Sequence, residues 1–110
     1  PIARKQLVQT QLADMAQELT KAQVLALHFG RLKENNALRP AQVSLMKRNN
    51  CKTALDIARR CRGLLGGNGI TGEFGVMRHA MNLESTYTYE GTHEIHSLVL
   101  GHALTGEKAF

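Results

Sequence analysis

The chain has 110 residues, a formal net charge of +5 and 43% hydrophobic residues, which fits one domain with a modest core. The positive charge permits an anionic partner such as nucleic acid, an acidic protein or a phosphate-bearing cofactor, and does not choose among them. No apolar run approaches the ~20 residues that cross a bilayer, so we expect no membrane span.

The residues from about Ile2 to Arg31 predict a long amphipathic helix. Apolar residues recur at alternating steps of four and three, opposite a face of Gln, Asp, Glu and Lys. This stripe consists of Val8, Leu12, Met15, Leu19, Ala22, Ala26 and Phe29. Glu34, Asn35 and Asn36 predict the end of the helix and a short loop.

A second long helix is predicted from Pro40, where proline is tolerated in the first turn, to about Leu65. Its predicted inner face consists of Val43, Met46, Asn50, Ala54, Ile57, Cys61 and Leu64. Asn50 interrupts this apolar face, and we interpret it as a buried amide bonded to a neighbouring helix. Cys51 and Cys61 lie about three turns apart on this helix, too far for a disulfide, which favours a reducing compartment.

Two shorter helices complete the prediction. Thr71 is the expected N-cap of the third helix, which carries Phe74, Met77 and Met81. The last helix is expected to begin at Thr92 and to close at Gly106. We expect its inner residues to be Ile95, Leu98, Val99 and His102. These elements predict an all-α fold, a four-helix up-down antiparallel bundle.

The stretch from Tyr87 to His96 carries the strongest chemical signal. Glu90 lies between Tyr89 and Gly91, just before the predicted helix cap Thr92. Gly91 allows an unusual backbone angle or a close approach. Glu90 is therefore either an exposed anion at a helix terminus or a partly desolvated base able to take a proton at neutral pH.

Three other patterns have plainer interpretations. The glycines at positions 66, 67 and 69 end a helix and lack the spacing of a phosphate-binding loop. Glu90 and His93 form a Glu-x-x-His unit, but a di-iron site needs a second unit, so we expect no metal. The basic residues Lys47, Arg48, Arg59, Arg60 and Arg62 lack interleaved aromatic residues, so we expect a solvated face or a subunit contact and no nucleic acid.

Two motifs in order, Leu65–Gly69 (Leu-Gly-Gly-Asn-Gly) and Tyr89–Thr92 (Tyr-Glu-Gly-Thr), resemble the C-terminal domain of the acyl-CoA dehydrogenases. The match covers essentially the whole chain. Within that family it is most similar to the glutaryl-CoA dehydrogenase branch. The run Arg78–Glu84 supports this, because most of the family reads Arg-Asp-Ala where this chain reads Arg-His-Ala. The chain also resembles a single C-terminal piece, residues 1–110, of a longer enzyme.

The resemblance implies roles for individual residues. Glu90 would be the base that removes the α-proton of an acyl-CoA thioester, its amide would help hold the thioester oxygen, and Gly91 would pass beside the substrate. FAD would be contacted by Gln6, by the segment Gly63, Leu64, Leu65, Gly66 and Gly67, by Thr92, His93 and Glu94, and by Phe110. Gly63 stands where many family members carry glutamine, so only a backbone contact is expected there.

The resemblance also implies an activity. Glutaryl-CoA would be oxidised and decarboxylated to crotonyl-CoA and CO2, with electrons passing to electron transfer flavoprotein. The implied assembly is a homotetramer, in the cytoplasm of a bacterium or the mitochondrial matrix of a eukaryote. Two alternatives stay open: a non-decarboxylating short-chain acyl-CoA dehydrogenase, and a helical assembly module that is inactive on its own.

Overall fold

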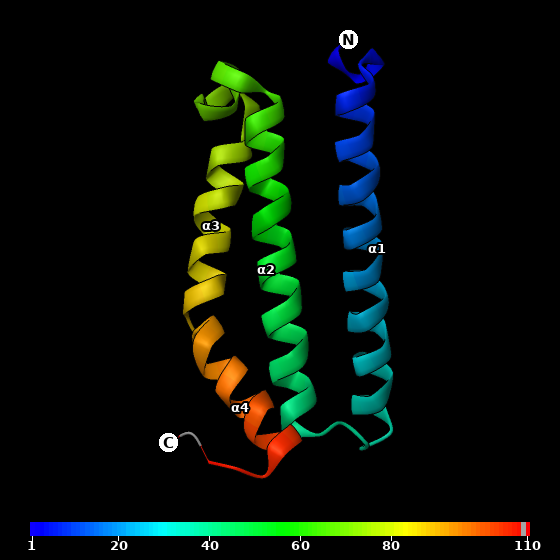
Figure 1. The fold of residues 1–110 in the computed structure, drawn as a ribbon, viewed down its shortest axis with the longest axis vertical. Helices are drawn as coiled ribbons and strands as arrows, with labels where there is room; N and C mark the ends of the chain where they lie inside the picture. Colours follow the sequence, from blue (N-terminus) through cyan, green and yellow to red (C-terminus); the bar gives the residue numbers. More distant parts are fainter. Residues whose placement is uncertain (109) are drawn as a thin grey trace.

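The computed structural model describes residues 1–108 and 110, and in that part of the chain all regular structure is helical (Figure 1). The α-helices are α1 (Gln6–Glu34), α2 (Pro40–Leu64), α3 (Val76–Thr88) and α4 (His93–Thr105). Short 3-10 helices are η1 (Ile2–Arg4), η2 (Gly66–Ile70) and η3 (Gly72–Phe74). The predicted all-α fold with four helices is confirmed.

α2 lies at the centre of the arrangement. α1 runs antiparallel to it on one side, and α3 and α4 follow each other end to end along the other side (Figure 1). The molecule is elongated, with extents of 50 × 26 × 24 Å. The break between α3 and α4 faces the N-terminal half of α2, near Lys47.

The ends of the two long helices follow from local sequence. The α1 C-cap is Asn35, and Asn36 adopts a left-handed φ of 55°, so that the Ala37 amide donates to the Leu32 carbonyl over 2.8 Å. Pro40 occupies the first position of α2, and the preceding Arg39 amide donates to Gln42 Oε1 over 2.8 Å, one half of a capping box.

α1 packs on α2 through Met15, Ala22 and Phe29, which are buried. Between the two helices, Asn50 Nδ2 donates to the Ala22 carbonyl over 3.1 Å, which confirms the predicted bond to a neighbouring helix, but the Asn50 side chain is only half-buried. The other predicted stripe residues of α1 are less covered: Leu12 is 44% and Leu19 49% exposed. Because α1 has one helical neighbour, only a narrow line of its stripe is buried.

α2 buries a second face that the single predicted stripe does not include. Its buried residues are Ser44, Leu55 and Ala58, all outside that stripe. Ser44 lies against α4, where its hydroxyl meets His96 Nδ1 at 3.0 Å. The one-sided interpretation of this helix was wrong because α2 is covered from both sides.

The third helix begins later than predicted. Thr71 precedes the short η3 turn, and its hydroxyl donates back to the Asn68 carbonyl over 3.0 Å. Gly75 then adopts a left-handed φ of 67° and breaks the chain direction, so that α3 starts at Val76 without a side-chain cap. Thr71 is thus not the N-cap of α3.

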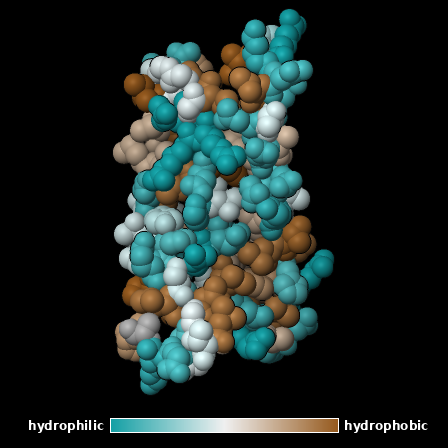
Figure 2. Space-filling view, in the orientation of Figure 1, coloured by the Kyte–Doolittle hydropathy of each residue, from teal (hydrophilic) through white to brown (hydrophobic). Residues whose placement is uncertain are grey.

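The inner face predicted for α4 was largely wrong. Ile95, Leu98 and His102 are exposed, and only Val99 of the four is partly covered. The face toward α2 is polar instead, with His96 on Ser44 and Ser97 on Arg48. Figure 2 shows brown apolar side chains at several places on the surface, and the exposed Ile95 and Leu98 belong to that class.

Within the described part of the chain, every helix falls short of the length or apolar character that a membrane crossing requires.

Candidate active site at the junction of the last two helices

The predicted turn around Glu90 forms the junction between α3 and α4. Tyr89 ends α3, and Glu90 follows with a left-handed φ of 54°. Gly91 has a φ of 94°, and Thr92 caps α4 by accepting the Ile95 amide over 3.3 Å. The prediction of a turn at the start of a helix capped by Thr92 is confirmed.

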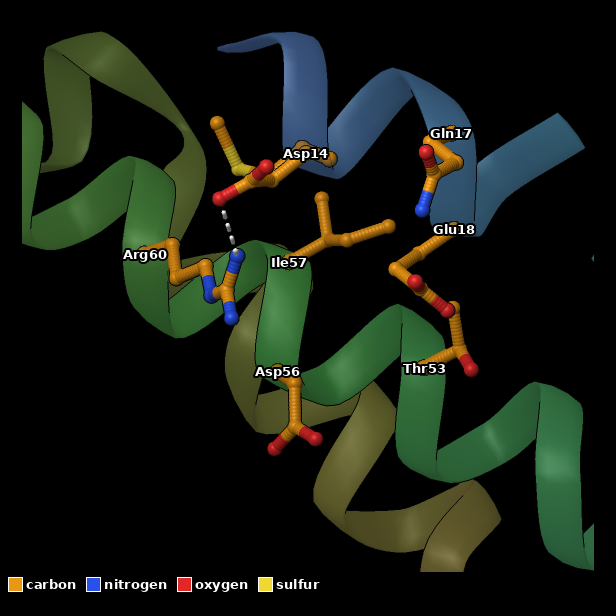
Figure 3. A pocket seen from close by; sticks show the side chains of 8 residues that line it. Asp14, Gln17, Glu18, Thr53, Asp56, Ile57 and Arg60 are labelled. Atoms are coloured by element: carbon orange, nitrogen blue, oxygen red, sulfur yellow. Dashed lines mark ion pairs between the residues drawn. The ribbon is translucent and has the colours of Figure 1, made fainter. Parts of the chain in front are cut away.

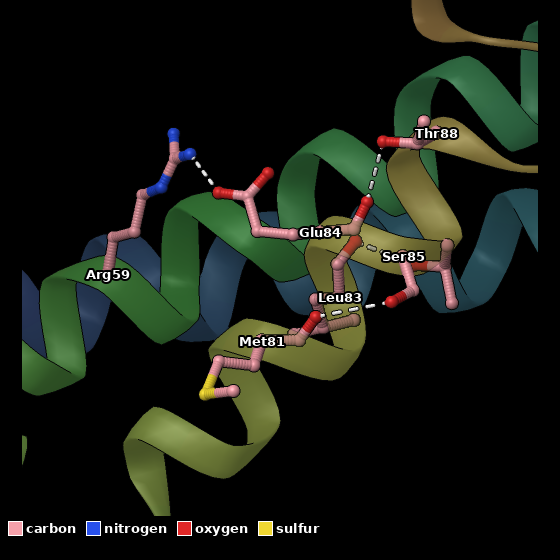
Figure 4. A network of polar contacts seen from close by, with 7 residues as sticks. Arg59, Met81, Leu83, Glu84, Ser85 and Thr88 are labelled. Atoms are coloured by element: carbon pink, nitrogen blue, oxygen red, sulfur yellow. Dashed lines mark hydrogen bonds and ion pairs between the residues drawn. The ribbon is translucent and has the colours of Figure 1, made fainter.

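Hydroxyl side chains line the last turns of α3, just before this junction (Figure 4). Ser85 donates to the Met81 carbonyl, and Thr88 donates to the Glu84 carbonyl over 2.9 Å. The Glu84 carboxylate in turn pairs with Arg59 of α2. These contacts supply carbonyls with partners near the point where the helix ends.

Gly91 is required by the fold itself. A Cβ added there would lie 2.8 Å from His96 Nε2, closer than carbon atoms approach such a group. Its φ of 94° is also unfavourable for any residue with a side chain. Gly91 is thus needed to accommodate the His96 ring, independently of the predicted passage of substrate beside it.

Side chains from α2 and α4 hold the turn through its carbonyl groups. Lys47 Nζ donates to the Tyr89 carbonyl and, over 2.5 Å, to the Gly91 carbonyl. His96 Nε2 donates to the Glu90 carbonyl over 3.2 Å. With Nε2 protonated, His96 Nδ1 accepts from the Ser44 hydroxyl at 3.0 Å.

Sequence reasoning missed Lys47 because its partners are more than forty residues away. It interpreted Lys47 and Arg48 as part of a solvated or intersubunit face. Both are half-buried, and Arg48 Nε donates to Ser97 Oγ over 2.7 Å. These two residues are therefore not on a fully solvated face, because they bond to the junction and to α4.

The side chain of Glu90 is exposed. None of the ion pairs among the described residues includes its carboxylate. The fold therefore fixes the backbone of Glu90 tightly and leaves its carboxylate available to a group outside this chain.

The first turn of α4 already holds an anion of its own. The pKa of Glu94 is lowered, first by its own backbone amide and then by the Thr92 hydroxyl. Its carboxylate thus meets donors that a helix N-terminus offers to an anion.

His93, the first residue of α4, stacks on Tyr87 with ring centroids 4.8 Å apart and an interplanar angle of 12°. Its Nδ1 is buried and has no hydrogen-bond partner among the described residues. Burial lowers the pKa of His93, and the neighbouring Arg48 cation lowers it further. The imidazole is therefore held neutral between α3 and α4.

The glycine turn, residues 63–69 at the end of α2, contains two glycines that the fold requires and two that it does not. Gly66 has a φ of 58°, and a Cβ on buried Gly69 would lie 2.1 Å from the Arg62 carbonyl oxygen. Gly63 and Gly67 are exposed, and beyond the adjoining backbone no described residue has an atom within 4 Å of a Cβ placed there. Leu64 and Leu65 between them are half-buried. The fold of this chain thus accounts for Gly66 and Gly69 but not for Gly63 and Gly67.

The predicted site residues fall into separate groups along the molecule (Figure 1). Exposed Gln6 begins α1 at the end of the bundle where α2 terminates in Gly63–Gly67. Gly63 lies about 24 Å along α2 from Lys47, and hence from the Glu90 turn, at the usual rise of about 1.5 Å per residue. Exposed Phe110 lies past α4, toward the opposite end.

A separate open pocket lies between α1 and α2 (Figure 3). It is lined by polar residues such as Glu18, Thr53 and Asp56, and Arg60 faces Asp14 across it at 4.0 Å. Among the described residues, no group of three or more His, Cys, Asp or Glu is arranged to hold a metal ion. This pocket shares no residue with the Glu90 turn.

Comparisons with known proteins agree with this geometry. Residues 1–105 match the family model for the acyl-CoA dehydrogenase C-terminal domain. A crystal structure of glutaryl-CoA dehydrogenase from Mycobacterium smegmatis superposes on the whole chain with a TM-score of 0.96 and 57% identity, over 28% of its own chain. A second structure of that enzyme, in complex with FADH2, is 55% identical.

More distant relatives extend the same match. The human mitochondrial short-chain specific acyl-CoA dehydrogenase is 34% identical over 105 residues, which is 94% of this chain and 26% of that protein. Butyryl-CoA dehydrogenase from Megasphaera elsdenii has a TM-score of 0.90 and 28% identity over 94% of this chain and 27% of its own. The chain thus spans about a quarter of the length of these relatives, and it belongs to the acyl-CoA dehydrogenase family, as its C-terminal domain.

Proposed function

We propose that this chain acts as the C-terminal domain of an FAD-dependent acyl-CoA dehydrogenase that converts glutaryl-CoA to crotonyl-CoA and CO2. The observation that carries the proposal is Glu90, an exposed carboxylate on a turn whose three carbonyls are held by Lys47 and His96. The 57% identity to the Mycobacterium smegmatis glutaryl-CoA dehydrogenase supports this substrate.

Glu90 is the proposed base for the α-proton of the thioester. An enolate-like charge develops on the thioester oxygen as that proton leaves, so a donor must face this oxygen. The Glu90 amide is suited to this role, because it donates to no other backbone group in the described part of the chain. FAD, when bound, accepts the hydride from the β-carbon.

The residues present fit a flavin cofactor at the glycine turn. Gly63 interrupts the last turn of α2, where alanine would be more favourable, and a Cβ added at Gly63 or Gly67 would have open space around it within the described part of the chain. Bare backbone at these positions permits close approach by a flat molecule. Gln6 begins α1 at the same end of the bundle.

A single copy of the chain does not gather all of the proposed flavin contacts. The glycine turn lies about 24 Å along α2 from the group Thr92, His93 and Glu94. We therefore propose that the glycine turn and Gln6 serve the FAD of a neighbouring copy, within a homotetramer, while Thr92, His93, Glu94 and Phe110 serve another flavin.

The remaining parts of the proposal rest on the relatives. They are about four times as long as this chain, and we propose that the intact enzyme supplies the rest of the flavin site, without which these 110 residues are inactive. Electron transfer flavoprotein is the proposed electron acceptor. The proposed location is the bacterial cytoplasm or the mitochondrial matrix.

The test uses the full-length protein and flavin absorbance under anaerobic conditions. Glutaryl-CoA should bleach the flavin and release CO2, and Glu90→Gln should slow bleaching by about 10²–10⁴-fold, the usual contribution of a general base. Glu84→Gln is the matched control, an exposed glutamate near the end of α3, and should leave the rate unchanged. Equal rates in wild type and E90Q would overturn the role of Glu90.

A second candidate substrate follows from the short-chain relatives, at 34% identity for the human protein. Butyryl-CoA, a saturated substrate with no carboxylate to lose, is the appropriate probe. Bleaching by butyryl-CoA and not by glutaryl-CoA would replace the decarboxylating activity with simple dehydrogenation and leave the role of Glu90 in place.

A further inference from the structure

Three consecutive carbonyl groups, those of Tyr89, Glu90 and Gly91, each accept a hydrogen bond from a side chain outside the turn. Lys47 of α2 takes the first and third, and His96 of α4 takes the second. Such complete capture is unusual for an exposed turn, whose carbonyls ordinarily bind water. It draws the whole turn toward the N-terminal half of α2.

The turn needs such support because of its backbone. Glu90 has a φ of 54°, a region that residues with a side chain rarely adopt. A residue held in this region persists when the surrounding structure determines its conformation. Lys47 and His96 supply that constraint. The hydroxyl of buried Ser44 contacts His96 Nδ1 and thereby orients the His96 ring.

The same contacts arrange the donors of the turn. With the carbonyls engaged by Lys47 and His96, the amides of Glu90 and Gly91 donate to no backbone carbonyl of the described residues. The amide and the Cα of Glu90 are then fixed by one rigid turn, and the exposed carboxylate extends from that Cα. In the proposed reaction the carboxylate is the base and the amide is a thioester donor.

We propose that Lys47 and His96 are positioning residues that hold Glu90 in its reactive geometry, with Lys47 the principal one. This inference rests on the proposed function, since it assigns the geometry of that base. Lys47 acts through two backbone carbonyls.

A charge effect of Lys47 on the Glu90 carboxylate is the competing explanation, and two variants separate it from positioning. Lys47→Met removes both hydrogen bonds and the charge while keeping an unbranched side chain. His96→Leu removes the hydrogen bond to the Glu90 carbonyl and leaves Lys47 and its charge in place. Positioning predicts that both variants impair the same step, whereas a charge effect predicts impairment in K47M alone.

The experiment measures anaerobic flavin reduction in the full-length enzyme as a function of acyl-CoA concentration. K47M should lower the limiting reduction rate about 10- to 100-fold, which is the effect expected when a reacting group is misplaced by about 1 Å. The acyl-CoA concentration that gives half of the limiting rate should change less than about threefold. H96L should lower the same rate, and the double variant should fall short of the product of the two losses, because both act on one turn. Lys47→Arg, which keeps donors for the carbonyls, should restore part of the rate.

Lys52→Met is the matched control. Lys52 lies on the same helix, is exposed and pairs with Asp56 rather than with the turn. Its variant should reduce flavin at the wild-type rate.

Several results would overturn the inference. The first is a wild-type limiting rate in K47M with flavin bound. The second is a change in the half-saturating acyl-CoA concentration alone, and the third is a K52M reduction rate as low as that of K47M. If K47M does not fold, H96L alone decides, and its wild-type rate would refute positioning. A wild-type enzyme inert to every acyl-CoA would instead refute the proposed function, and this is visible before any variant is made.

Discussion

Two turns of this molecule hold a left-handed residue by different means. Gly66 after α2 and Glu90 after α3 have nearly the same φ, 58° and 54°. The first turn owes its form to glycine, which adopts this region freely. The second places a carboxylate in that region and relies on Lys47 and His96 to keep it there. The first turn thus needs only a change of direction, whereas the second also presents a side chain and is supported by donors from α2 and α4.

The most damaging single change to the first turn should be Gly69→Ala. Its Cβ would lie 2.1 Å from the Arg62 carbonyl oxygen, and a helix backbone cannot move aside as a flexible side chain can. We expect a loss of about 3 kcal/mol in the free energy of unfolding, at the upper end for overpacking. Urea denaturation measures it, with Gly72→Ala, an exposed glycine with no atom nearby, as the control.

The corresponding change in the second turn is Gly91→Ala. The obstacle there is the His96 ring at 2.8 Å, which can rotate, so the steric penalty is smaller than at Gly69. The φ of 94° adds backbone strain, and we expect a loss of about 2 kcal/mol. G91A combined with His96→Ala should recover part of this loss in the same assay, and no recovery would mean that His96 is not the obstacle.

These two glycines also show what the sequence can and cannot predict. The turn at Glu90, the Thr92 cap and the helix stop at Gly66 are local events, so composition and spacing predict them. Two contacts depend instead on how the helices pack: Gly91 with His96, and Lys47 with the Tyr89 carbonyl. No local sequence pattern encodes that packing. The inner face of α4 was missed for the same reason, because it is polar and bonds to Arg48 and Ser44.

Gly63 differs from the glycines of both turns, because neither its backbone conformation nor a close contact requires a glycine there. It interrupts the last turn of α2 with open space around it, as Gly30 does near the end of α1. Replacing either by alanine should stabilise the chain by about 0.5–1 kcal/mol. Only Gly63→Ala should also weaken flavin retention in the full-length enzyme, measured by dialysis and absorbance. Equal retention in both variants would remove Gly63 from the flavin site.

The smallest expected effect concerns pH and His93, which follows the second turn. Burial lowers the pKa of His93 from its ordinary value of 6.5 in the folded chain. The unfolded chain therefore binds the proton first as the pH falls, so stability decreases below about pH 6.5 and is unaffected well above it. His93→Gln should flatten the dependence of the unfolding free energy between pH 7 and 5, followed by urea titration. An unchanged slope would show that other groups cause it.

The central position of α2 has a consequence for motion. α1 packs mainly on α2, through a narrow line of buried residues, so it can separate transiently while α2, α3 and α4 remain assembled. Amide hydrogens of α1 should then exchange with solvent through this partial opening, and those in the middle of α2 only on global unfolding. Lys47, the anchor of the Glu90 turn, lies on α2 and so outside this partial opening. Separation of α1 thus leaves the backbone of the Glu90 turn where α2 and α4 hold it.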